Sequence, residues 1–368
     1  MPVPEALVNR TRTGPAAPAG PRHPGLILAF LCLAGFMTFL DVSIVNVALP
    51  TIERGLQIPE SYLQYVVTAY GTVLGGFLLL GGRLADTFGR RRILRAGLVV
   101  FALASLLAGV AQGSLMLVLA RGLQGLGSAF IAPAALSLLT NTFPEGPQRA
   151  RALGTWGAVS GIASVVGVIL GGLLTEGPGW RWIFFINVPI GLAAAALAPA
   201  IVPESRAHTR RRTFDTTGAV VLTAGLVLLI YTLGRTVDDG WASASTIVSL
   251  AVVAVLLLAF VLIERRTRDP LIPFAIFRLR ALRIANLTAL LMLATLVTLF
   301  FFASLYAQVA LGESSQNAGL FLLVFFGVGL VAVRSVLPRR DVAALALAPA
   351  VGAGVVTLAA VAVLFVAR

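Results

Sequence analysis

Apolar runs long enough to cross a bilayer recur along almost the whole chain, and this pattern limits the fold more than any other feature. A transmembrane helix needs about 20 predominantly apolar residues. About eleven segments meet this length, at residues 25–49, 62–82, 93–111, 115–139, 154–174, 182–201, 216–234, 244–263, 284–308, 317–337 and 342–367. The sequence therefore predicts an all-α polytopic membrane protein with about 11 transmembrane helices.

Composition supports this class of protein. Charged residues make up only 12% of the chain, whereas soluble domains carry about 25%, so an ordinary soluble enzyme is excluded. His23 and His208 fall in polar segments, and Cys32 stands alone in an apolar run. We therefore expect no metal site, no disulfide within the chain, no catalytic centre and no cofactor.

The basic residues are all arginine, 28 in number, and the formal net charge is +13. In a soluble protein such a charge would suggest nucleic-acid binding. Here the arginines gather in short polar segments between apolar runs, where the positive-inside rule makes them cytoplasmic anchors. We therefore expect no nucleic-acid partner, and a multi-pass protein of the cell (inner or plasma) membrane with a cytoplasmic N-terminus.

The spacing of the apolar runs divides the chain into four parts. Residues 1–24 are predicted to form a disordered cytoplasmic tail, and 25–201 a bundle of six closely spaced helices. Residues 202–283 hold polar linkers around an inserted helix pair. Residues 284–368 are predicted to form a partial C-terminal bundle of three helices, because a copy as long as the first bundle would need about three more.

Asp41 is a carboxylate inside the first apolar run. An Asp at the centre of a membrane helix costs roughly 2.5–3.5 kcal/mol, so it usually has a partner. Arg121 is the expected partner, because a rise of 1.5 Å per residue places both charges roughly 10–12 Å below the outer surface. Opposite charges at one depth offset each other's desolvation. The alternative is that Arg121 extends outward alone to reach water.

A motif of glycine and arginine, residues 81–92, joins the second and third predicted spans. Its candidate gating residues are Gly82, Arg83, Asp86, Gly89, Arg90 and Arg91. The glycines permit a tight reversal, and Asp86 lies where the N-terminus of the next helix can stabilise a carboxylate. The alternative is a charged turn that only sets topology.

Several motifs resemble those of the major facilitator superfamily. Residues 81–92 resemble its signature loop, and Leu40 to Pro50 resembles the first-helix motif of its fourteen-helix drug:proton antiporters. Residues 119–127 resemble the fourth-helix motif tied to proton coupling, and 157–172 the fifth-helix antiporter motif. Residues 180–189 resemble the family's usual entry into helix six. The resemblance extends over most of the chain and is stronger in the first half.

This resemblance implies a major facilitator fold and a proton-coupled efflux transporter (antiporter) of hydrophobic or amphipathic small molecules such as drugs. Asp41 and Arg121 would couple protons to transport. The implied partners are the small-molecule substrate, protons and the lipid bilayer, and the expected state is a monomer. Two alternatives remain open: an exporter or importer of one specific metabolite in the same superfamily, or a truncated membrane protein that transports nothing.

Polar side chains in the first, second and fourth predicted spans are candidates for a substrate path. They are Asn46, Gln64, Tyr70 and Gln124. Ordinary hydrogen bonds between helices would explain the same residues.

The fifth predicted span carries small residues at helical spacing. The candidate helix-packing residues are Gly157, Gly161, Gly167, Gly171 and Gly172. Small residues four apart let helices approach backbone to backbone, and the resemblance implies a second role, in sealing the protein against proton leak. Val168 stands where the family pattern usually has proline, which predicts a straighter helix than in strict antiporters.

Overall fold

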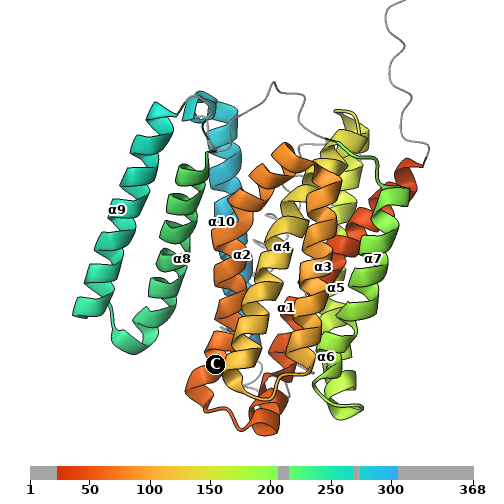
Figure 1. Cartoon of the computed structure of the whole chain (residues 1–368), viewed down its shortest axis with the longest axis vertical. Coiled ribbons are helices and arrows are strands. Elements are labelled where there is room, and N and C mark those ends of the chain that lie inside the picture. Colours follow the sequence, from red (N-terminus) through yellow and green to blue (C-terminus); the bar gives the residue numbers. More distant parts are fainter. Residues whose placement is uncertain (1–22, 206–214, 268–269, 271–273, 306–368) are drawn as a thin grey trace, which may run out of the picture.

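The computed structural model describes residues 23–205, 215–267, 270 and 274–305 (Figure 1). Helices make up the regular structure of this described part. They are α1 (Pro24–Leu56), α2 (Glu60–Phe88), α3 (Arg90–Gly109), α4 (Ser114–Thr142), α5 (Pro147–Glu176), α6 (Trp182–Phe185), α7 (Asn187–Ile201), α8 (Thr216–Asp239), α9 (Ala244–Arg266), the short 3₁₀ helix η2 (Phe274–Arg278) and α10 (Arg280–Leu305).

Eight spans in the described part are long and apolar enough to cross a membrane, with α6 and α7 together forming the span Trp182–Ile201. These spans confirm the first eight predicted segments. Helix α10 covers most of the ninth predicted segment, 284–308. The last two predicted segments, 317–337 and 342–367, lie outside the described residues.

Some helices continue well beyond the apolar runs that predicted them. Helix α1 passes through Pro50 and ends at Leu56, followed by Gln57 in a left-handed conformation with a φ of 50°. Helix α2 continues to Phe88, past its predicted end at residue 82. The predicted segments were too short because an apolar run marks only the part of a helix that lies inside the hydrocarbon layer. The helix itself continues for as long as its backbone hydrogen bonds are satisfied.

Helices α1 to α7 pack into one bundle (Figure 1). Helix α4 is central: α2 and α3 both pack along it, while α1 packs against α5 and α3 against α7. The α3–α4 contact depends on glycine, since a Cβ on Gly97 would lie 2.8 Å from the carbonyl oxygen of Gly127. Such small residues let membrane helices meet backbone to backbone. The packing brings α1, α3, α4 and α7 together in the middle of the bundle.

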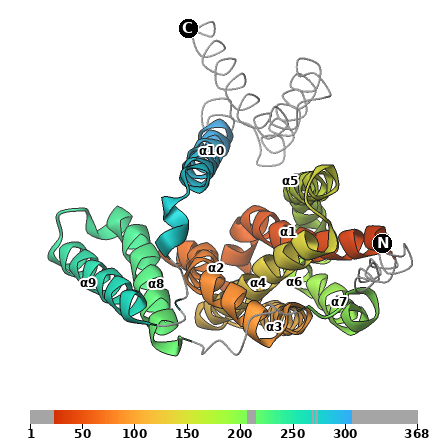
Figure 2. The same ribbon diagram turned by 90° about the horizontal axis from the view of Figure 1, so that it is seen from above.

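Helices α8 and α9 form a hairpin beside this bundle, and α8 packs along α2 (Figure 2). Side chains cap both helix starts. Asp215 Oδ1 accepts a hydrogen bond from Gly218 N at 2.9 Å, and Ser243 Oγ accepts one from Thr246 N at 3.2 Å. Caps of this kind stabilise a helix start by about 0.5–2 kcal/mol. The hairpin occupies the segment predicted to hold an inserted pair, and the division of the chain into domains stays a prediction.

Candidate functional site

A layer of polar side chains separates two buried apolar clusters of the α1–α7 bundle. One cluster includes Met37 of α1 and Phe101 of α3, and the other includes Ile44 of α1 and Ala108 of α3. The polar residues between them come from α1, α3, α4 and α7. They are Asp41, Ser105, Arg121, Gln124 and Asn187, and together they form the buried polar cluster.

The centre of the buried polar cluster is an ion pair. Arg121 Nη1 donates a hydrogen bond to Asp41 Oδ2, and the two side chains are 2% and 0% exposed. The pairing predicted from depth is confirmed, and the alternative in which Arg121 reaches water alone is wrong. Burying either charge without the other costs several kcal/mol, so each side chain depends on its partner.

The second oxygen of Asp41 is held by two amides. Gln124 Nε2 donates to Asp41 Oδ1 at 3.0 Å, and Asn187 Nδ2 donates to the same atom at 3.2 Å. Gln124 Nε2 also donates to Ser105 Oγ at 2.8 Å. The two carboxylate oxygens of Asp41 thus accept hydrogen bonds from Arg121 on one side and from two amides on the other.

Arg121 is also held by contacts other than the one with the Asp41 carboxylate. Its Nε donates to the backbone oxygen of Val66 on α2 at 3.0 Å, and its Nη1 donates to Gln124 Oε1 at 2.8 Å. The guanidinium carbon lies 4.5 Å from the centre of the Tyr70 ring. Tyr70 in turn donates to Ser128 Oγ at 2.8 Å. The cation is thereby positioned by α2 as well as by α1 and α4.

The four residues predicted on a substrate path lie in three different environments. Tyr70 and Gln124 are buried against the ion pair. Asn46 is exposed and donates to Val42 O in its own helix at 2.9 Å. Gln64 lines a separate pocket between α2 and α8. The structure therefore does not gather them along one path, and contact of any of them with a substrate stays a prediction.

Ser105 and Asn187 belong to the buried polar cluster but were missed as site residues. Asn187 lies in the motif at residues 180–189, and a buried amide within an apolar run is the signal that could have found it. Ser105 gives almost no signal, because serine is common in membrane helices, where its hydroxyl bonds to the preceding turn. Here Ser105 Oγ donates to Phe101 O at 2.8 Å.

Of the motif's glycines, which were predicted to permit a tight reversal, only Gly89 lies at the turn. Gly81 and Gly82 lie inside α2, and the chain reverses only at Gly89, whose φ is 111°. Gly81 instead permits close packing: a Cβ there would overlap the carbonyl oxygen of Ala129 on α4. The motif's glycines thus have two roles, a turn at Gly89 and helix packing at Gly81.

The N-terminus of α3 is stabilised by a residue far away in sequence. Arg91 N donates to Glu204 Oε1 at 3.1 Å, and Glu204 Oε2 lies 3.6 Å from Arg91 Nε. Asp86, predicted to fill this role, instead accepts from Arg90 Nη2 at 2.8 Å. The carboxylate at this helix end is therefore Glu204, which joins the end of α7 to the motif.

Glu204→Gln is expected to lower the free energy of unfolding by about 1 kcal/mol, because it removes an anion from a helix N-terminus. Chemical unfolding in mixed micelles measures the change. Glu145→Gln is the matched control, since Glu145 is 87% exposed in its pair with Arg149 and such surface pairs contribute about 0–1 kcal/mol. Equal losses in the two variants would contradict the capping role of Glu204.

The predicted packing glycines of α5 divide into two groups. A Cβ on Gly167 would lie 3.0 Å from Leu40 O, and one on Gly171 would lie 3.2 Å from Ile44 O, so these two glycines pack against α1. Gly172 is buried. A Cβ on Gly157 or Gly161 would meet nothing within 4 Å in the described part of the chain. For Gly157 and Gly161 the packing role therefore stays a prediction.

Comparison with known proteins identifies the family. Residues 31–367 match the family described as Major Facilitator Superfamily. The chain belongs to this superfamily. Its multi-pass helical architecture is therefore that of a member of the Major Facilitator Superfamily.

Major facilitator relatives share a substantial part of the sequence. The chain is 41% identical over 327 residues to the cephamycin export protein CmcT of Amycolatopsis lactamdurans, covering 87% of this chain and 67% of the relative. It is 39% identical to the puromycin resistance protein pur8 of Streptomyces alboniger, covering 85% and 62%. It is 37% identical to the multidrug resistance protein Stp of Mycobacterium tuberculosis, covering 79% and 54%. The chain thus spans about half to two thirds of the length of these relatives.

Solved structures support the same fold. A peptide transporter POT in complex with sulfate matches with a TM-score of 0.56 at 14% identity, covering 86% of this chain and 70% of that one. The human organic anion transporter MFSD10 matches with a TM-score of 0.55 at 15% identity, covering 86% and 72%. At such low identity these similarities concern the fold alone.

Proposed function

We propose that this chain is a proton-coupled efflux transporter of hydrophobic or amphipathic small molecules, drugs among them, in the cell membrane. The observation that carries the proposal is the fully buried Asp41–Arg121 ion pair within a chain of eight described spans. Ionisable side chains inside a membrane are rare and usually mark ion or proton pathways. The names of the relatives, which concern antibiotic export and drug resistance, support the substrate class.

Protonation of Asp41 would change the contacts among α1, α4 and α7 directly, and those of α3 through the Gln124–Ser105 hydrogen bond. Charged Asp41 holds Arg121 and the amides of Gln124 and Asn187. A proton on Asp41 removes the negative charge that neutralises Arg121, so the guanidinium is left with neutral acceptors only. The balance between packing arrangements of α1, α3, α4 and α7 then shifts, which is how a proton would bias alternating access.

Asn187 gives the protonated state a suitable acceptor. Its Nδ2 donates to Asp41 Oδ1, while its Oδ1 has no hydrogen-bond partner in the described structure. Rotation of the amide would exchange the two atoms, so that Oδ1 accepts the new hydrogen bond from a protonated Asp41. The cluster could therefore hold the proton without leaving the carboxylic acid unsatisfied.

Orientation follows from the arginines between the spans, which place the N-terminus in the cytoplasm under the positive-inside rule. In this orientation a gradient that is acidic outside would deliver protons to Asp41 from the outer side and release them inside. The exchange of protons for substrate would then drive export. We further propose that the transporter acts as a monomer.

Asp41→Asn is expected to reduce gradient-driven transport to the level of empty liposomes. The full chain is reconstituted, a pH gradient is imposed, and the movement of the aromatic dye ethidium is followed by fluorescence. Asparagine keeps the size of the side chain but cannot gain or lose the proton. Glu145→Gln, at an 87% exposed carboxylate, is the control and should transport like the unchanged protein. Gradient-driven transport by Asp41→Asn would contradict the proposed coupling.

A further inference from the structure

The linker between α9 and α10 brings apolar and basic side chains together at one end of two long helices. Its described part includes the short helix η2, which leads into the first turn of α10 (Figure 1). Three apolar residues, each more than a third exposed, lie next to three exposed arginines. These six residues form the linker surface: Phe274, Ile276, Phe277, Arg278, Arg280 and Arg283.

The linker surface lies where α10 leaves the hydrocarbon layer. Ile284 and Leu287 of α10 are 54% and 57% exposed, as expected for side chains that face lipid. Arg280 and Arg283 precede these two residues by four positions each. One helical turn rises only about 5.4 Å, so the guanidinium groups lie within reach of the lipid headgroups, and their apolar stems can extend along the membrane boundary.

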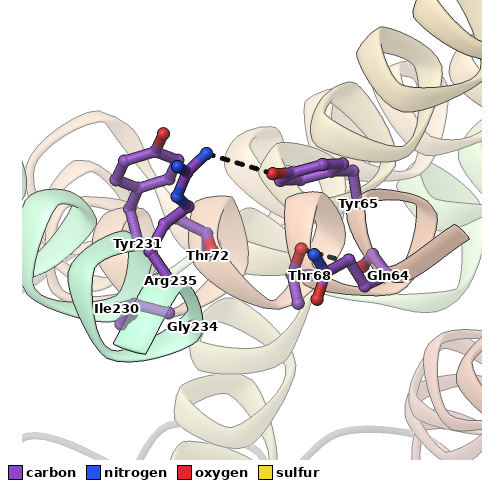
Figure 3. Close-up of a pocket in the computed structure, with 8 residues that line it drawn as sticks. All are labelled: Gln64, Tyr65, Thr68, Thr72, Ile230, Tyr231, Gly234 and Arg235. Carbon is purple, nitrogen blue, oxygen red and sulfur yellow. Dashed lines mark hydrogen bonds between the residues drawn. The ribbon is translucent and has the colours of Figure 1, made fainter. Parts of the chain in front are cut away.

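The arginines of the linker surface form no ion pair with any described residue. Arg280 and Arg283 are three positions apart on one helix face, where like charges are unfavourable. Arg235 of α8, by contrast, donates to Asp239 at 3.0 Å and to the Tyr65 hydroxyl at 3.3 Å (Figure 3). The whole sequence has 28 basic and only 15 acidic residues. An anion that complements this surface therefore has to come from outside the chain.

The exposed aromatic rings indicate which kind of anion fits. The rings of Phe274 and Phe277 have their centres 6.5 Å apart and form one apolar patch. A dissolved anion would neutralise the arginines but leave these rings in water. A phospholipid offers a phosphate and an acyl chain at adjacent depths, and segments that combine basic and aromatic side chains next to a membrane span are typical of lipid-binding surfaces.

We propose that the linker surface binds anionic phospholipids. Phosphate groups contact Arg278, Arg280 and Arg283, because arginine N–H groups form strong, charge-assisted hydrogen bonds with phosphate oxygens. Phe274 and Phe277 lie at the boundary of the acyl chains. In the orientation proposed above, these are lipids of the cytoplasmic leaflet. The class of lipid depends neither on that orientation nor on proton coupling.

Fluorescence quenching in the full chain tests the proposal. Leu279→Cys, at a 61% exposed position, is introduced into a Cys32→Ala background, labelled with bimane and reconstituted in phosphatidylcholine vesicles. Nitroxide-labelled phosphatidylglycerol or phosphatidylcholine is added at one mole fraction, with the nitroxide at the headgroup end of the acyl chain. Because basic clusters next to a span attract anionic lipids, we expect phosphatidylglycerol to quench several-fold more strongly. Equal quenching by the two lipids, or none by either, would overturn the proposal.

Two double variants and one control position localise the effect. Arg280→Gln/Arg283→Gln should remove most of the preference for phosphatidylglycerol. Arg265→Gln/Arg266→Gln removes the same charge from the exposed end of α9 and should keep it. Bimane at Trp241→Cys, on the exposed turn between α8 and α9, should be quenched no more by phosphatidylglycerol than by phosphatidylcholine. A preference that survives in the first variant, falls equally in both, or also appears at Trp241 refutes the proposal.

Discussion

Arg121→Leu should lower the free energy of unfolding by about 3–5 kcal/mol, because it leaves Asp41 charged and buried without its cation. Asp41 has 0% exposure, so water cannot replace the lost partner. Gln124 and Asn187 still donate to it, but neutral amides compensate a buried charge only in part. Chemical unfolding in mixed micelles measures the loss. Arg92→Leu is the control, because the Arg92 side chain is 67% exposed, and it should change the free energy of unfolding by less than about 1 kcal/mol.

The double variant Asp41→Leu/Arg121→Leu separates the stability of the fold from its function. Replacing a whole buried ion pair by apolar side chains is often neutral or stabilising. We therefore expect it to recover most of the stability lost by Arg121→Leu while remaining inactive in gradient-driven transport. If the double variant were as unstable as Arg121→Leu alone, the unpaired charge of Asp41 would not be the cause of the lost stability, and this explanation would be contradicted.

The ion pair could be predicted because its signal is strong in sequence. A charge within an apolar run is costly, and counting residues from the outer surface gives its depth. The neutral members of the cluster are harder to predict. Ser105 and Asn187 are buried beside Asp41. Placing serine or asparagine in a membrane helix costs far less free energy than placing a charge there, so neither residue stands out. The periodicity of one helix also does not show which other helix packs against it.

Long-range contacts explain the other differences between prediction and structure. Glu204 reaches the N-terminus of α3 from 113 residues away, and no local pattern links it to Arg91. Asp86 was the natural prediction because it lies next to that helix end in sequence. The packing of α8 against α2 could not be predicted from the sequence either. It depends on how each helix is rotated about its own axis, and hydropathy alone does not determine that rotation.

Gly81→Ala should destabilise the fold by about 1–3 kcal/mol, the range for overpacking a well-filled interior. The added Cβ would overlap Ala129 O and lie 2.9 Å from Ala129 C and 3.2 Å from Phe130 Cδ1 on α4. Backbone atoms of a helix cannot rotate away, so α2 and α4 would have to separate. These helices also carry Val66, Tyr70 and Arg121, so we expect gradient-driven transport to fall as well.

Gly82→Ala is the matched control, one residue further along the same helix. Among the described residues its Cβ would meet only Pro133 Cβ, at 3.6 Å, which is an ordinary contact. Alanine is also favoured over glycine in a helix interior by about 1 kcal/mol, so Gly82→Ala should be as stable as the unchanged chain or more so. Unfolding in mixed micelles compares the two variants. If the two glycines instead formed the turn that their sequence suggested, both substitutions would destabilise the protein, and this shared loss would contradict a continuous α2.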